Sequence, residues 1–268
     1  MEINQIDKIN SGDMPFTALL YCPTGVGKST AIGLIAEAGK GKTLVLDVDR
    51  TIDRTLAKHE IVKDTSKVYT VKIDNINTFE DWTNTLKELV EMKEQGTLDF
   101  ETIAVDNISE LERCILSDLG RQGKNKGVPA QADYQYMQFK LVNSLRYMKS
   151  LGVNIVWTAW EDVRQIVSPD GTSYSQIIPK MSLKIVDNIC GLCDVVGKIL
   201  VNKDNEHGIL LEATQNIYAK NQIDTRKACK VEEFSHFKKG DKELWHGIIR
   251  ERKVTDLHHF LKASTGSG

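Results

Sequence analysis

A glycine-rich segment near the start of the chain, residues 21–30, has the residue types that bind phosphate groups. It reads Tyr-Cys-Pro-Thr-Gly-Val-Gly-Lys-Ser-Thr and lies between an apolar run and an apolar-periodic stretch. Gly25 and Gly27 allow a tight turn whose backbone N–H groups point at a phosphate, and the positive end of the following helix adds attraction. Lys28 can then reach the terminal phosphates, and Ser29 can bind Mg²⁺. These features predict a nucleoside triphosphate site made by Thr24, Gly25, Val26, Gly27, Lys28, Ser29 and Thr30.

Two features of the sequence limit what this motif establishes by itself. Cys22 stands where the full phosphate-loop pattern has its first Gly, which affects how the chain enters the loop but not the phosphate cradle. A second Gly-Lys-Thr at residues 41–43 precedes a strand-like run instead of following one. The alternative interpretation of residues 21–30 is an ordinary glycine turn that caps a helix. The strand before the segment and the helix after it favour the phosphate loop.

Acidic residues follow two of the predicted strands. The run 100–106 ends in Asp106, which could hold Mg²⁺ through its water shell. The run 43–49 ends in Asp47 and Asp49, one of which could orient and deprotonate an attacking water. A single acid at a strand end is more often a helix cap or a turn former. Because both runs come after a phosphate loop, and ligands sit at the carboxyl ends of such strands, the catalytic interpretation is favoured.

The elements that must position these residues alternate between strand and helix. We predict strands at 16–22, 43–48, 68–73, 100–106 and 153–159, and helices at 28–38, 79–95, 108–119 and 134–149. This alternation indicates an α/β fold with a mostly parallel central sheet flanked by helices. Later segments predict a hairpin at 163–178, a helix at 180–191, and strands at 193–202, 208–214 and 216–220 that add antiparallel edge strands.

Composition excludes several classes of protein. A hydrophobic content of 41%, a charged content of 27% and a formal charge of -2 over 268 residues are typical of a soluble globular chain. The sequence has no signal peptide and no long apolar run, so we expect a cytoplasmic protein without a membrane partner. Five cysteines do not suggest a disulfide framework. Cys190 and Cys193 are interpreted as structural thiols, with metal binding as the alternative.

The order of these elements and motifs resembles the RecA superfamily of P-loop NTPases, most closely the small phage RecA-like ATPases of the Sak type, which promote single-strand annealing. The resemblance covers about residues 16–222, so residues 1–222 are predicted to form a RecA-like ATPase core and 223–268 a C-terminal extension with a flexible tail. It implies that Asp106 is the metal-associated acid. It also implies that Asp49 is the catalytic base, although the family has Glu there. The shorter side chain could misplace the carboxylate and slow hydrolysis.

The resemblance also assigns a sensor strand and two DNA-binding loops. The sensor strand of the family ends in Gln or His, whereas Trp160 stands there and cannot accept a hydrogen bond, so Thr158 or Glu161 would have to contribute. Residues 120–133 and 161–180 occupy the positions of the two loops that bind single-stranded DNA. The alternative for each basic side chain is a solvated surface residue. Phosphate contacts or base stacking are predicted for Arg121, Lys124, Lys126, Arg164, Tyr174 and Lys180.

Lys220 lies in a segment that resembles the edge strand whose lysine reaches the γ-phosphate of the neighbouring protomer in RecA filaments. It would stabilise transition-state charge there, as an arginine finger does. A lysine on an edge strand can equally protect that edge from unwanted pairing. The catalytic role would place ATP between subunits of a homo-oligomer, either a ring or a filament.

Together with the phosphate-loop motif, the resemblance implies a phage DNA recombination protein that binds ATP and Mg²⁺, hydrolyses ATP, binds single-stranded DNA and promotes strand annealing or pairing. A single-strand-binding protein is a common companion in the resembled family. A helicase-like motor on the same core is the first alternative. A nucleotide-gated binding protein with weak or no hydrolysis is the second, suggested by Cys22, Asp49 and Trp160. A small-molecule kinase is a third, although the hairpin offers only Arg164 for a lid.

Overall fold

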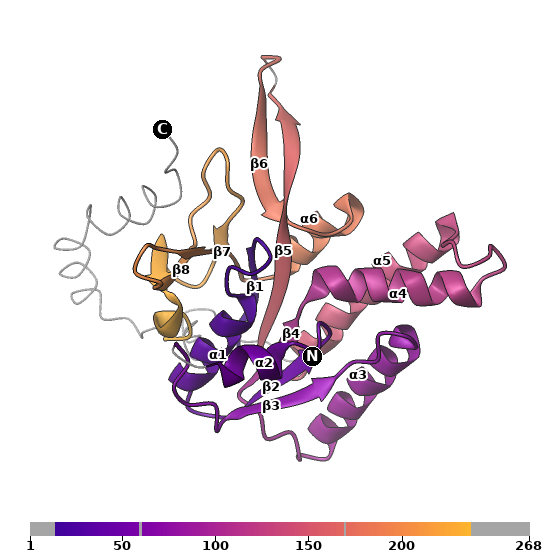
Figure 1. Cartoon of the computed structure of the whole chain (residues 1–268), viewed down its shortest axis with the longest axis horizontal. Coiled ribbons are helices and arrows are strands. Elements are labelled where there is room, and N and C mark those ends of the chain that lie inside the picture. The colour runs from indigo at the N-terminus through magenta and orange to yellow at the C-terminus, as the bar shows by residue number, and fades with distance from the viewer. Residues whose placement is uncertain (1–13, 59–60, 169, 237–268) are drawn as a thin grey trace, which may run out of the picture.

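The computed structural model describes residues 14–58, 61–168 and 170–236. Within these residues the chain forms a ten-stranded mixed sheet whose strands run in the order β10-β8-β7-β1-β5-β4-β2-β3, with β6 paired to β5 and β9 to β7. The parallel strands are β1 (Thr17–Cys22), β2 (Thr43–Asp47), β3 (Val68–Lys72), β4 (Thr102–Asp106), β5 (Asn154–Val167) and β7 (Val195–Val201). The predicted α/β fold with a mostly parallel sheet is confirmed (Figure 1).

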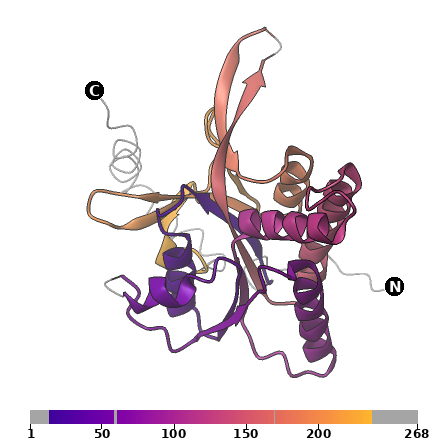
Figure 2. The same cartoon turned by 45° about the vertical axis from the view of Figure 1, so that its right-hand side comes forward.

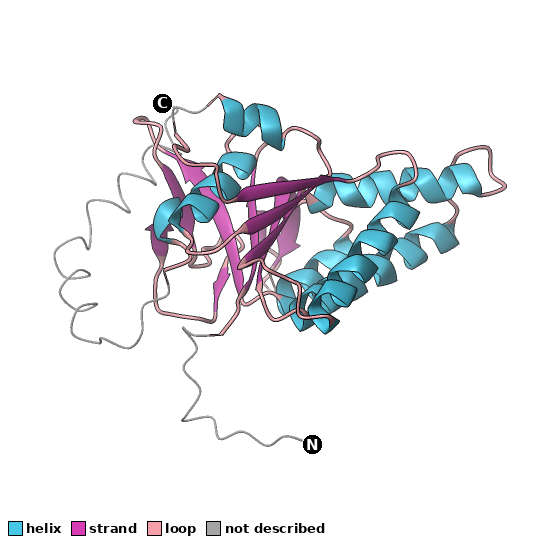
Figure 3. Cartoon of the chain, turned by 90° about the horizontal axis from the view of Figure 1, so that it is seen from below, coloured by secondary structure: helices cyan, strands magenta, loops and turns pink. Residues whose placement is uncertain are grey.

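Helices cover both faces of this sheet. One face packs on α1 (Lys28–Ala38) and α2 (Ile52–Ala57). The other packs on α3 (Thr78–Glu94), α4 (Ile108–Gln122), α5 (Gln131–Ser150) and α6 (Leu183–Leu192). Figure 3 shows the long helices α3 to α5 gathered on one side of the strands. The sheet is thus buried between two helical layers, as the near-continuous apolar character of its central strands requires.

Strand β1 shows how the sequence makes two cores. All six of its residues are buried, and side chains alternate between the faces. Leu19 and Tyr21 pack in the core under α3 to α6, whereas Ala18 and Leu20 pack in the core under α1 and α2. Because both faces of the sheet are covered, the sequence of β1 is almost entirely apolar. Residues 23–27 directly follow its carboxyl end.

Antiparallel strands extend the sheet at its edges, as predicted. They are β6 (Ser173–Pro179), β8 (His207–Leu210), β9 (Lys220–Asn221) and β10 (Ala228–Lys230). Strand β5 does not stop at residue 159 as predicted but continues to Val167, so its outer half and β6 form a hairpin that projects from the body of the molecule (Figure 2). In the described residues, no helix combines the length and apolar character that crossing a membrane requires.

The chain continues to contribute to the body of the molecule after residue 222. Strand β10 pairs with β8, and the short 3-10 helix η3 (Val231–Glu233) packs on α1. Phe234 is buried against Phe16, with ring centroids 5.6 Å apart in an edge-to-face arrangement. The predicted boundary at residue 222 stays a prediction, and the predicted flexible tail lies outside the described residues.

Candidate nucleotide site

The predicted phosphate loop joins the carboxyl end of β1 to the start of α1, which is the setting that the sequence indicated. Gly25 and Gly27 have φ angles of 82° and 121°, in the region that favours glycine. Gly27 is the N-cap of α1, and its carbonyl accepts a hydrogen bond from Ala31 N at 2.8 Å. The first turn of α1 therefore presents free backbone N–H groups to the loop, where they can bind an anion.

Ser29 and Asp106 meet at the mouth of this loop. The Ser29 hydroxyl donates to Asp106 Oδ2 over 2.5 Å, and the Thr158 hydroxyl donates to Asp106 Oδ1 over 2.7 Å. Asp106 ends β4 and Thr158 lies in the adjacent β5, and both side chains are fully buried. Both carboxylate oxygens are therefore held in place by hydroxyl groups. The two residues predicted to bind metal lie together, and Thr158 positions one of them.

This pair of oxygens suits Mg²⁺, which prefers hard oxygen ligands and usually keeps several waters. Ser29 Oγ would coordinate the ion directly, and Asp106 would hold it through a water or through Oδ2. Lys28 is buried at the start of α1, beside the same end of the sheet. The phosphate groups of a bound nucleotide would balance the positive charge of the Lys28 ammonium.

Asp49 lies next to this group, held by a neighbour of Asp106. Asn107 Nδ2 donates to Asp49 Oδ2 over 2.7 Å, and the backbone N–H of Asp49 donates to Asp106 O at 3.1 Å. Burial and the Asp106 carboxylate raise the pKa of Asp49 to about 7, although Lys28 and Asn107 act in the opposite direction. A carboxyl group with a pKa near neutrality is suited to general base catalysis.

The other acid of the pair, Asp47, has a different role. Its two carboxylate oxygens accept from the backbone N–H groups of Thr51 and Ile52, each at 3.3 Å, at the start of α2. It is fully buried, and burial raises its pKa despite these bonds. Asp47 therefore anchors a helix end, which leaves Asp49, held beside Asp106 by Asn107, as the candidate base.

Trp160 and Glu161 lie in the middle of β5, where its pairing with β1 ends beside the site. The Trp160 ring lies under the Arg113 guanidinium, 5.6 Å from its centroid, and its backbone N–H donates to Ser109 Oγ at 2.9 Å. Glu161 Oε2 is 2.9 Å from Lys198 Nζ, and both side chains are largely buried. Trp160 is thus a packing residue. The carboxylate of Glu161 is paired with a lysine of β7, so an additional role for it as a phosphate sensor stays a prediction.

The first predicted DNA loop is shorter than residues 120–133, because α4 extends to Gln122 and α5 begins at Gln131. Arg121 belongs to α4, and its guanidinium donates to Ser117 Oγ at 2.9 Å and also to the Ile76 carbonyl. Lys124 and Lys126 lie in the loop itself and are exposed. Of the three basic residues predicted to contact DNA here, Lys124 and Lys126 are exposed loop residues, whereas Arg121 is part of α4.

The second predicted DNA loop is the β5–β6 hairpin. Arg164 is engaged within it, since Nε and Nη2 donate to Gln176 Oε1 and Nη1 lies 3.2 Å from Asp187 of α6. Tyr174 is half-buried, and Lys180 is exposed just after β6. Residues 161–180 contain three acids and only two bases, so this loop lacks the net positive charge of the first. The hairpin alone is a weak electrostatic site for a polyanion.

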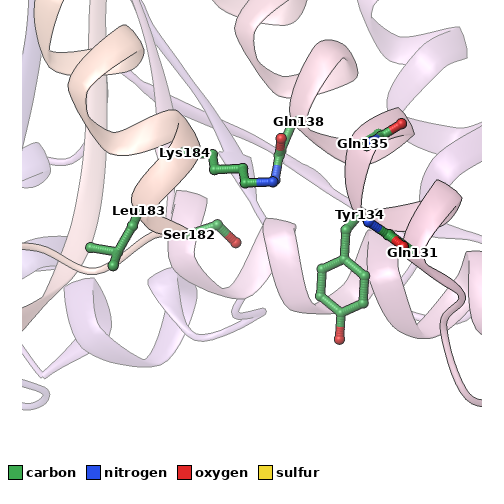
Figure 4. A pocket seen from close by; sticks show the side chains of 7 residues that line it. All are labelled: Gln131, Tyr134, Gln135, Gln138, Ser182, Leu183 and Lys184. Atoms are coloured by element: carbon green, nitrogen blue, oxygen red, sulfur yellow. The ribbon is translucent and has the colours of Figure 1, made fainter.

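A pocket lies between the ends of these two loops, where the first turn of α5 faces the first turn of α6. It is lined by Gln131, Tyr134, Gln135, Gln138, Ser182, Leu183 and Lys184. Figure 4 shows Lys184 reaching from α6 toward Gln138 on α5. The amide groups, the lysine and the aromatic ring were not singled out in the sequence, because the two helix starts are far apart along the chain.

Lys220 lies in β9, at the edge of the sheet. Its ammonium donates to the carbonyl oxygens of Cys190, Gly191 and Cys193 at 3.2, 3.0 and 2.7 Å. These carbonyls belong to the C-terminal end of α6, where a cation is favourable. Lys220 pairs with Val196 near the start of β7, while the phosphate loop follows the end of β1. The predicted role in a neighbouring site therefore requires Lys220 to leave these carbonyls.

The cysteines are buried or half-buried free thiols. Burial raises the pKa of Cys22, which is the last residue of β1, to about 12, and it raises that of Cys190 to about 12 as well. Thiols held in the neutral form are poor nucleophiles. Cys22 therefore fills core space at the entry to the phosphate loop.

Comparisons with known proteins agree with this geometry. The chain matches the AAA domain family over residues 14–223 and belongs to that family. It thus contains an AAA-type P-loop NTPase domain. No curated protein matches the chain.

Two solved ATPase structures are similar to the chain. An ATP synthase subunit, NeqB from Nanoarcheaum equitans, has a TM-score of 0.51 at 12% identity, with 97% of this chain and 64% of that chain covered. A prototypical ATPase from the type III secretion system of pathogenic bacteria has a TM-score of 0.43 at 15% identity, with 71% and 52% covered. The chain thus spans between about half and two thirds of the length of these ATPases, and at such identities the likeness to NeqB concerns the fold alone.

Proposed function

We propose that this protein is an ATP-hydrolysing phage recombination protein that binds single-stranded DNA and promotes strand annealing or pairing. The observation that carries the ATPase part is the cluster at the phosphate loop, where Ser29 contacts Asp106 and Asp49 lies alongside, held by Asn107. A binding loop for phosphate, a pair of oxygens for Mg²⁺ and a candidate base near neutral pKa are the parts that hydrolysis of a terminal phosphate needs.

The chemistry assigns a separate role to each residue. Backbone N–H groups of the loop and the Lys28 ammonium bind the phosphate oxygens and neutralise their charge. Asp49 accepts a proton from the water that attacks the γ-phosphorus, and the bond between that phosphorus and the bridging oxygen breaks to release ADP. Mg²⁺, if held by Ser29 and Asp106, would supply further charge neutralisation. Thr158 keeps the Asp106 carboxylate oriented.

The DNA-binding part is supported by a weaker set of features. Lys124 and Lys126 are exposed in the loop that precedes α5, and Lys180 is exposed at the base of the hairpin. The pocket between α5 and α6 lies between these segments and adds Lys184 and Tyr134, a cation and a ring that can contact phosphate and base. Single-stranded nucleic acid is the partner that combines charged backbone with stacking bases.

A direct test is binding of a fluorescent single-stranded oligonucleotide at low salt, with and without ATP and Mg²⁺, followed by annealing of two complementary strands. The proposal predicts binding that strengthens with ATP and faster annealing. Absence of affinity for single-stranded DNA under these conditions contradicts the DNA-binding part and leaves an ATPase of another kind. Unwinding of a forked duplex would instead identify the helicase-like alternative.

A nucleotide-gated binding protein is the second candidate, favoured by Asp49 standing where the resembled family has Glu. If the shorter side chain slows hydrolysis, the Asp49→Glu variant gains turnover. Unchanged turnover in that variant, with ATP still bound, supports a protein that uses ATP binding alone.

A further inference from the structure

Helix α5 carries most of the exposed aromatic rings of this protein. In the part of the chain that the structure describes, five Phe, Tyr or Trp side chains are exposed, and one of them, Tyr69, lies on β3. The other four all belong to α5: Tyr134, Tyr136, Phe139 and Tyr147. Burial of an aromatic ring is strongly favourable, so four rings left exposed on one helix indicate a surface that binds a partner.

Three of these rings share the outer face of the helix. Phe139 follows Tyr136 by three residues, and Tyr147 follows Tyr136 by eleven, which is about three full turns. The opposite face holds the side chains that pack in the core: Met137, Leu141, Leu145 and Met148. The outer rings are therefore not needed to attach α5 to the body of the molecule. We call this outer surface, formed by Tyr136, Phe139, Asn143, Arg146 and Tyr147, the aromatic face.

The charge of α5 suits an anionic partner. The exposed residues of this helix include two cations, Arg146 and Lys149, and no acid. Lys149 is paired with Asp194, 3.6 Å away, beyond the end of the helix. Arg146 belongs to the aromatic face, and its guanidinium donates to Asn143 Oδ1 at 2.8 Å. A positive charge thus lies among the rings, where it can contact a phosphate while bases contact the rings.

The aromatic face continues the surface that holds the exposed lysines of the first loop. The segment with Lys124 and Lys126 leads directly into the start of α5, and the pocket beside that start contains Tyr134 and Lys184. At about 1.5 Å per residue, the face extends about 16 Å along α5 to Tyr147. Bases stacked as in one strand of DNA lie about 3.4 Å apart, so this length matches about five nucleotides.

A single strand fits the aromatic face better than a duplex. The bases of a single strand can leave their neighbours and stack on aromatic side chains, whereas paired bases in a duplex cover one another. Tyr136 stacks on Phe79 of α3, with ring centroids 5.2 Å apart, and still remains 57% exposed. This contact holds the Tyr136 ring in place, which reduces the entropy lost when a base binds to it.

We infer that the aromatic face of α5 is a base-stacking surface for single-stranded DNA, along which a strand runs from the loop at Lys124 toward Tyr147. The inference rests on the proposed function and divides the DNA site in two. The lysines of the loop and pocket contact phosphates, while Tyr136, Phe139 and Tyr147 contact bases. Binding at these rings is independent of base sequence, because every base has a π-face.

The test compares two single-stranded probes of equal length, one of ordinary DNA and one that keeps the sugar-phosphate backbone but has no bases. The variant combines Phe139→Leu with Tyr147→Leu, which removes two exposed rings and leaves an apolar residue that favours helix. Tyr147→Leu alone is compared with Tyr69→Leu, the same change at the exposed ring of β3. Fluorescence anisotropy at low salt with ATP and Mg²⁺ gives the affinities. Thermal melting verifies that each variant is folded.

The wild type is expected to bind ordinary DNA at least about tenfold more tightly than the probe without bases, a difference of about 1.4 kcal/mol. The double variant should lose most of this preference and bind the probe without bases as the wild type does. Tyr147→Leu should lose part of the preference, and Tyr69→Leu should retain all of it.

Three results would overturn the inference while DNA binding stands: a wild type without preference for bases, a double variant that keeps the full preference, or an equal loss for both probes. If the double variant keeps its preference but changes its sedimentation coefficient, the aromatic face is instead a contact between copies of the chain. Absence of binding to both probes by the wild type contradicts the DNA-binding part of the proposed function itself.

Discussion

Asn107 Nδ2 donates a hydrogen bond of 2.7 Å to Asp49 Oδ2. Asn107 directly follows β4 and Asp49 lies two residues after the end of β2, so this bond links the ends of the two strands. The same side chain caps α4, because its Oδ1 accepts from Glu110 N at 2.9 Å. The Asn107 amide is fully buried, and each of its ends has a partner. The orientation of the candidate base thus depends on the start of a helix.

Two substitutions at Asn107 separate these functions. Asn107→Ser keeps an acceptor suited to the helix cap but removes the donor to Asp49, so ATP turnover should fall on the order of tenfold with little change in stability. Asn107→Ala removes both contacts and should also lower the free energy of unfolding by about 1 kcal/mol. Steady-state turnover and urea denaturation measure the two effects. Full turnover in Asn107→Ser would show that Asp49 needs no such support.

The raised pKa of Asp49 predicts a pH-dependent stability of the nucleotide-free protein. The folded pKa is about 7, above the value of about 4 in an unfolded chain, so the folded state binds the proton more tightly. This contribution is fully present below about pH 4 and is lost as pH rises through about 7. Asp49→Asn resembles the protonated form at every pH. Its melting temperature should therefore decline less than that of the wild type between about pH 5 and pH 8.

The comparison for Asp49 needs a control acid. Asp53→Asn removes an exposed carboxylate that pairs with Lys72 on the surface, and it should leave the wild-type pH profile nearly unchanged. Parallel profiles for the wild type and Asp49→Asn would mean that the Asp49 carboxylate is ionised in the folded protein at pH 5.

Ser109 connects the two ends of the hairpin base to α4. Its hydroxyl accepts from Trp160 N at 2.9 Å and donates to Lys180 O at 2.8 Å, and the residue is buried. Ser109→Ala leaves both backbone groups without this partner and should cost about 1–3 kcal/mol. Ser117→Ala, at an exposed position of α4, should stay within about 0.5 kcal/mol of wild type. Equal stability of the two variants in urea denaturation would contradict this role.

The DNA-binding proposal predicts a specific salt dependence for the loop before α5. If Lys124 and Lys126 each contact a phosphate of single-stranded DNA, replacing both with Ala should reduce the slope of log affinity against log salt by about 0.7 per contact. Replacing the exposed Lys87 and Lys93 of α3 removes the same charge elsewhere. A slope that changes equally in both double variants would indicate a general charge effect and not a binding loop.

The parts of the fold that the sequence predicted are those with long periodic segments. Helix α1 has the predicted bounds, and the parallel strands lie within about two residues of theirs except at the end of β5, which continues to Val167. Helix α2, at Ile52–Ala57, was missed because six residues are too few to show a helical period. The start of α2 explains the role of Asp47, whose carboxylate accepts from the first backbone N–H groups of a helix that was not predicted.

Contacts between segments that lie far apart in the chain could not be predicted from the sequence. Nothing near His207 in the chain indicates that its ring packs on Gly27, because only the β7–β8 pairing brings it there. Thr158 was considered only as a substitute sensor, yet its hydroxyl holds Asp106. Lys220 was predicted to reach the nucleotide of a neighbouring protomer, whereas in the structure its ammonium donates to three carbonyl groups at the end of α6. Each case depends on the register of strands that only the folded sheet sets.

The two Gly-Lys-Ser/Thr segments of this chain provide a matched test of the central claim, that residues 23–30 bind and hydrolyse ATP. Lys28 is buried in the phosphate loop, whereas Lys42 lies on the surface in an ion pair with Asp99. We would measure ATP turnover of the wild type, Lys28→Ala and Lys42→Ala at saturating Mg²⁺. The account predicts turnover in the wild type and in Lys42→Ala, with a loss of at least about 100-fold in Lys28→Ala. Equal turnover in Lys28→Ala and the wild type would contradict it.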